Sequence, residues 1–161
     1  MKKLPDIRKE VQPFFDAVKN MLVDRVKEGK PPFPPLHMFA TLTLYAQHHL
    51  NQPSQIVLVP DWQGPEQKAH CIAQFVTFLN KYCESAILCG GGYGTHSGFG
   101  KNEVMYVFAT QYMPGYEPWT LAQLYTAVEK EVIFDAECCS SDGNVEFFDL
   151  PGLWPKGVPP V

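Results

Sequence analysis

The pattern of apolar and polar positions near the N-terminus predicts an amphipathic helix over residues 13–28. Its apolar residues recur every three or four positions, with charged residues between them, and Gly29 follows where a helix would close. Proline is tolerated in a first helical turn, whereas it breaks or kinks a helix from inside, so we expect the helix to begin at Pro13. The proline-rich run 30–36 predicts a rigid, extended connector.

Two runs of β-branched and aromatic residues follow this connector. Residues 37–47 and 55–62 predict sequential antiparallel strands, because turn-forming residues separate them. The run 64–83 then has the period of a helix, with Pro65 and Glu66 suited to its first turn. We expect His70, near the start of this helix, to play no chemical role.

The second half of the chain predicts further strands. Residues 84–89 and 102–112 are apolar on both faces, which is typical of interior strands. The run 119–130 is ambiguous; its apolar spacing favours a helix to about Lys130, followed by a strand. Asp142-Gly143 predicts a hairpin turn that leads into a returning strand over 145–150.

This order of elements predicts an α+β fold: a mostly antiparallel β-sheet with two or three helices packed on it. We interpret the 161 residues as a single domain, with an α+β core over 37–150 and a proline-rich tail over 151–161. We expect no export signal at the N-terminus, and no apolar run of the sequence is long enough to span a membrane. The chain has five cysteines, an odd number, and they lack the spacing of paired metal ligands. We therefore expect reduced thiols, a cytoplasmic protein and no metal site.

The formal net charge of −4 is unevenly distributed. Residues 1–80 carry nine basic and seven acidic side chains, whereas residues 81–161 carry four and ten. Phosphate backbones are bound by clustered lysine and arginine, and the sequence has no such cluster, so we expect no nucleic-acid partner.

The most unusual stretch is the glycine-dense run 89–101, CGGGYGTHSGFGK. It fits neither the phosphate-binding pattern GxxxxGK[ST] nor the dinucleotide pattern GxGxxG, so we predict no cofactor. We interpret 90–100 as a loop, which either connects two strands as a flexible excursion or lines a binding site. The candidate ligand-binding residues are Gly91, Gly92, Tyr93, Gly94, His96, Ser97 and Lys101. The catalytic candidates are Cys89 as a nucleophile and His96 as its base, although burial of Cys89 would raise its pKa.

Aromatic residues favour a different class of function. Tyr116, Trp119 and Trp154 stand among prolines and glycines, where we expect exposed loops, and such side chains are enriched at the centres of interfaces. The leading hypothesis is therefore a small interaction or self-association module without catalytic activity. The alternative is a small enzyme or ligand-binding domain whose pocket is lined by the glycine-rich loop 90–100.

Overall fold

The computed structural model describes residues 4–42, 55–59, 61–96, 101–116, 118–135, 139–142, 150 and 153–154. Within them lie two helices and seven strands. In chain order these are α1 (Leu4–Lys27), β1 (His37–Leu42), β2 (Gln55–Leu58), α3 (Gly64–Tyr82), β3 (Cys83–His96), β4 (Lys101–Tyr112), β5 (Trp119–Val128), β6 (Glu131–Phe134) and β7 (Cys139–Asp142). The predicted α+β fold with an antiparallel sheet is confirmed.

All the described strands belong to one sheet, in which every pairing is antiparallel. The order across the sheet is β2-β1-β3-β4-β5-β6, and β7 also pairs with β5. β6 pairs with residues 125–128 and β7 with residues 119–122, so the two short strands lie end to end along β5. At their junction Gln123 donates from Nε2 to the carbonyl oxygen of Asp135 (2.6 Å), and the Asp135 amide donates to the Leu124 carbonyl oxygen (2.9 Å).

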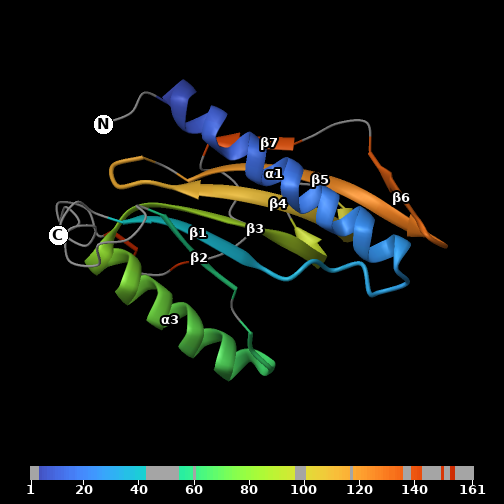
Figure 1. Ribbon diagram of the computed structural model, residues 1–161, viewed down its shortest axis with the longest axis horizontal. Helices are drawn as coiled ribbons and strands as arrows, with labels where there is room; N and C mark the ends of the chain where they lie inside the picture. The colour runs from blue at the N-terminus through green and yellow to red at the C-terminus, as the bar shows by residue number, and fades with distance from the viewer. Residues whose placement is uncertain are drawn as a thin grey trace.

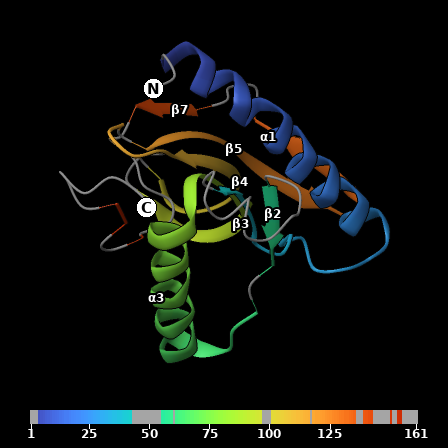
Figure 2. The same ribbon diagram turned by 60° about the vertical axis from the view of Figure 1, so that its left-hand side comes forward.

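One helix packs on each face of the sheet (Figures 1 and 2). We call these faces the α1 face and the α3 face. On the α1 face, buried side chains of α1 meet alternate residues of β3, β4 and β5; this cluster includes Val11, Phe15, Val18, Leu22, Val26, Cys89, Val107, Ala109, Trp119, Leu121 and Tyr125. On the α3 face the cluster includes Met38, Ala40, Leu42, Val76, Leu79, Ala86, Leu88, Phe108, Tyr112 and Ala122. The alternation follows directly from the two-residue period of a strand.

The N-terminal helix is longer than predicted. α1 runs from Leu4 to Lys27 and contains Pro13 in its interior, so the expectation that it begins at Pro13 is wrong. The reason is packing: Val11, on the N-terminal side of the proline, is fully buried with Phe15, while Pro13 itself faces solvent. Burial of an apolar stripe stabilises a helix more than propensity does, and here it offsets the hydrogen bond that proline removes.

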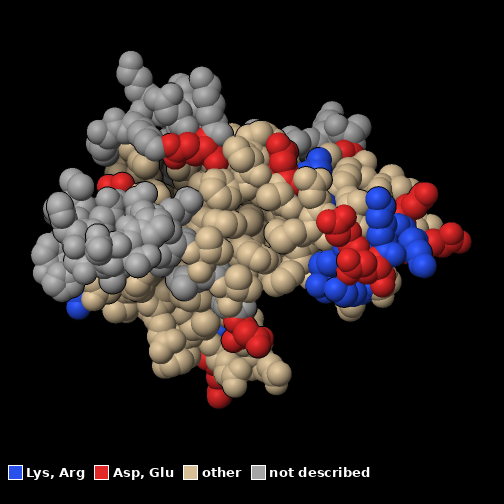
Figure 3. Space-filling view, in the orientation of Figure 1, with Lys and Arg blue, Asp and Glu red and all other residues tan. Residues whose placement is uncertain are grey.

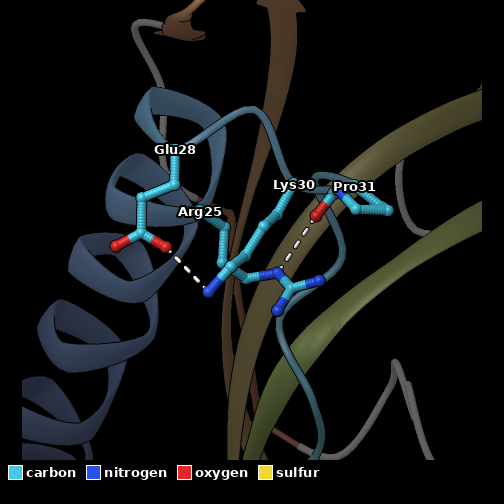
Figure 4. A network of polar contacts seen from close by, with 4 residues as sticks. All are labelled: Arg25, Glu28, Lys30 and Pro31. Carbon is cyan, nitrogen blue, oxygen red and sulfur yellow. Dashed lines mark hydrogen bonds and ion pairs between the residues drawn. The ribbon is translucent and has the colours of Figure 1, made fainter.

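The C-terminal end of α1 is closed by Gly29, as its sequence indicates. Gly29 adopts a φ of 75°, and the Lys30 amide donates to the carbonyl oxygen of Arg25 (2.9 Å). Figure 4 shows the side chains around this turn: Lys30 pairs with Glu28 (2.8 Å), and Arg25 donates to the Pro31 carbonyl oxygen (3.0 Å). The hydrogen bond from the Lys30 side chain, together with the charges of Lys30 and Arg25, lowers the pKa of Glu28. In Figure 3 basic and acidic side chains are interleaved over this end of the helix.

The ambiguous run 119–130 is a strand, so its interpretation as a helix is wrong. Trp119, Leu121 and Tyr125 lie on the α1 face, whereas Thr120 and Ala122 lie on the α3 face. Both faces of β5 are covered along its first half, which makes the strand apolar on both sides and conceals its period of two. The predicted strand after it is divided between β6 and β7. The predicted turn at Gly143 and the strand over 145–149 lie outside the described residues.

Candidate functional site

The glycine-rich run is part of the sheet over most of its length. β3 continues through residues 90–96, and Gly90, Gly91 and Gly92 pair with Phe108, Val107 and Tyr106 of β4. The interpretation of 90–100 as a loop is therefore wrong for 90–96. Residues 97–100, including the candidate Ser97, lie outside the described residues.

Packing explains why these positions of β3 are glycines. A Cβ added at Gly90 would lie 3.3 Å from the Leu36 Cα, and one added at Gly91 would lie 2.9 Å from the Pro34 Cδ. The proline-rich connector thus approaches β3 more closely than a side chain would permit. The Tyr125 hydroxyl holds the connector by donating to the Pro32 carbonyl oxygen (2.7 Å). Glycine at these positions therefore permits close contacts between segments of the protein itself.

The candidate ligand-binding residues do not share one surface of the sheet. Gly91 faces Pro34 on the α1 face, whereas Gly92 lies against the ring of Tyr106 on the α3 face. Adjacent residues of a strand point to opposite faces, so these two glycines cannot line one pocket. The backbones of Tyr93, Gly94 and His96 belong to β3, and that of Lys101 to β4; their side chains lie outside the described residues.

The candidate nucleophile Cys89 lies in the sheet interior. It is fully buried on the α1 face, and this burial raises the pKa of its thiol to about 12, so the thiol is protonated at neutral pH. His96 stands seven residues further along the same strand, about 23 Å away at the usual strand rise. This separation gives no support to a pair in which His96 takes the proton of Cys89. Cys71, Cys83 and Cys89 are free thiols.

The aromatic anchors predicted from sequence are less exposed than expected. Trp119 is only 7% exposed, because it begins β5 and packs beneath α1; its assignment to an exposed loop is wrong. Trp154 is partly buried against the α3-face core, where its backbone amide donates to Asn80 Oδ1 (2.7 Å) and its indole Nε1 to the Leu79 carbonyl oxygen (3.3 Å). Tyr116 is partly exposed in the turn between β4 and β5.

The outward surface of α3 carries a groove of about 460 Å³. His70, Thr77, Phe78 and Tyr82 are among its lining side chains. The rings of Phe78 and Tyr82 lie 5.3 Å apart, and the Lys81 ammonium lies 5.2 Å from the centre of the Tyr82 ring. Figure 2 shows that α3 meets the sheet near its C-terminal end, and residues 64–70 are exposed. All of the named lining residues belong to α3, and the groove is open to solvent.

A further feature, missed at the level of sequence, is the outer edge of β2. Among the described residues, no strand pairs with β2 on the side away from β1. Val57 and Val59 are 53% and 54% exposed there. Val57 is the cross-strand partner of Phe39, whose ring lies 4.5 Å from that of Phe14 in α1. We call Phe39, Val57 and Val59 the edge patch.

The two outermost strands of the sheet differ in charge. Residues 55–59 contain no charged residue and no proline, whereas β6 carries Glu131 and is flanked by Glu129, Lys130 and Asp135. Proteins protect exposed strand edges from pairing with other chains by placing charged residues or proline on them. The β6 edge has this protection, and the β2 segment lacks it until Pro60 and Asp61.

Comparison with family models, with curated proteins and with solved structures finds no match to this chain. Within the described ranges, no group of three or more histidine, cysteine, aspartate or glutamate side chains is placed to hold a metal ion. Neither α1 nor α3 is long and apolar enough to cross a membrane.

Proposed function

We propose that this protein is an association module that binds an extended segment of polypeptide along the outer edge of β2. The observation that carries the proposal is a strand edge without charge and without a described neighbour, bearing the half-exposed Val57. An extended segment added to a strand edge pairs with the outward amides and carbonyls of that strand, and its alternate side chains contact those of the edge strand.

The proposal keeps the association function expected from sequence and moves it to another surface. Trp119 is in the core and Trp154 is tied to α3, so neither supports an exposed aromatic interface. Val57 and Val59 are more exposed than either side chain, and Val57 lies opposite Phe39 in the sheet. The competing hypothesis of a pocket within a loop over 90–100 has less support, because 90–96 form a strand.

A displayed library of random nine-residue peptides tests the proposal. Peptides selected on the wild-type protein should lose binding to the variant Val57→Lys/Val59→Lys, because edge lysines oppose strand addition. Val128→Lys is the matched control, since Val128 is a strand valine of similar exposure, 51%, on β5. Peptides that bind both variants as well as wild type would contradict the proposal.

A further inference from the structure

The structure points to a specific partner for this edge: we propose that β2 pairs antiparallel with β2 of a second copy of the chain. This inference rests on the proposed function and adds the identity of the added strand. Two identical antiparallel strands are related by a two-fold axis, so the contact is self-complementary and closes at a dimer.

Charge is the first argument for self-pairing. Every residue from Gln55 to Val59 is uncharged, so pairing this segment with itself places no like charges opposite one another. A charged partner strand would lose hydration and find no opposite charge on β2. A second copy supplies a neutral, β-branched strand of equal length. The charges around β6 make the opposite edge of the sheet unsuitable for the same contact.

We place the two-fold axis on Val57, the exposed residue of β2 that lies opposite Phe39. This register pairs residues 55, 56 and 57 with residues 59, 58 and 57 of the other copy. The two Val57 side chains then stand side by side on the α1 face, about 5 Å apart at their Cβ atoms. Because Phe39 is the neighbour of Val57 on that face, the edge patches of the two copies become continuous.

The size of the contact sets its strength. A pairing of five residues on each chain, with the small edge patch, lies at the lower end of the areas buried by specific complexes. Each copy carries a net charge of −4, which adds a repulsion that salt screens. We therefore expect a reversible dimer that dissociates on dilution and is strengthened by added sodium chloride.

Sedimentation of the full chain over a range of concentrations tests the inference with a charge exchange at one position. Val57→Lys and Val57→Glu should each weaken dimerisation at least about tenfold, since each places two like charges opposite one another. An equimolar mixture of the two variants should recover the dimer, because Lys and Glu are then opposed. Val128→Lys and Val128→Glu are matched controls that should leave the dimer unchanged, alone or mixed.

Circular dichroism and thermal unfolding of each variant establish that the fold is retained, as expected for a half-exposed side chain. A wild-type chain that is monomeric at every concentration, or a Val57 mixture that does not recover the dimer, would overturn the self-pairing. The peptide library separates this failure from that of the proposed function. Binding of selected peptides to a monomeric protein, lost in Val57→Lys/Val59→Lys, would leave the proposed function standing with a different partner; loss of both would overturn both.

Discussion

Gly92 and Tyr106 are cross-strand partners in β3 and β4, and the tyrosine ring lies over the glycine. A Cβ added at Gly92 would stand 2.6 Å from both Cζ and Oη of Tyr106. Two positions earlier in β3, a Cβ at Gly90 would meet the Leu36 backbone. At Gly90 and Gly92 other residues of the protein therefore contact the backbone of β3 directly, with no side chain between them.

The variants Gly91→Ala and Gly92→Ala should differ in stability. The Pro34 ring beside Gly91 is buried and fixed to the backbone, so Gly91→Ala should cost about 1–3 kcal/mol of unfolding free energy. At Gly92 the nearest atoms are the far end of the Tyr106 side chain, which can turn aside. Removing a strand glycine contributes about 0.5–1 kcal/mol in favour of the folded state in both variants, and the smaller steric cost at Gly92 should make Gly92→Ala much less destabilising. Urea unfolding measures both values, and an equal cost would contradict this account.

The hydroxyls of Thr110 and Thr120 form a buried pair across β4 and β5, 2.7 Å apart. Thr110→Val removes one partner and leaves the other hydroxyl buried and unpaired, which should cost about 1–3 kcal/mol. The double variant Thr110→Val/Thr120→Val removes both polar groups and should be closer to wild type than the single variant. Additive losses in a double-mutant cycle would show that the two hydroxyls are not coupled.

Alkaline pH should destabilise the protein through its buried thiols. Burial raises the pKa of Cys83 and Cys89 from the ordinary value of 9.0 to about 12. Below pH 9 both states are protonated and the thiols cause no pH dependence. Between about pH 9 and 12 the unfolded chain releases protons that the folded chain retains, so stability falls as pH rises, by up to about 1.4 kcal/mol per unit for each thiol.

Urea unfolding at pH 8, 9.5 and 10.5 measures this alkaline slope. Cys89→Ala should reduce it, and Cys71→Ala, at a partly buried thiol, is measured alongside as a second cysteine substitution. A slope that is the same in all three proteins would show that Cys89 does not carry the effect.

Trp154 should contribute to stability and leave association unaffected. Its ring packs on the α3-face core and its indole Nε1 donates to the Leu79 carbonyl oxygen, so loss of the side chain in Trp154→Ala should cost about 1–3 kcal/mol. The backbone amide that donates to Asn80 is kept in this variant. Peptide binding and dimerisation at β2 should remain at the wild-type level. Loss of association with unchanged thermal stability would instead show that Trp154 is part of the interface.

The local elements with strong sequence signals could be predicted from the amino acids alone. The run 64–83 carries a helical period with proline and glutamate in its first turn, and α3 occupies Gly64–Tyr82. The alternating run 102–112 lies within β4, and Gly29 closes α1 with a positive φ. These features depend on short-range chemistry: backbone conformation, capping and the spacing of apolar residues.

Features that depend on contacts between distant segments could not be predicted in this way. α1 extends to the N-terminal side of Pro13 because Val11 packs against the sheet. Trp119 is buried because α1 covers the beginning of β5. The glycines of β3 resemble a loop in sequence, since the connector and the tyrosine ring that occupy their space come from other parts of the chain. The exposure of Val57 likewise depends on the order of strands across the sheet. A sequence specifies such neighbours only through the free energy of the whole fold, in which burial outweighs local preference.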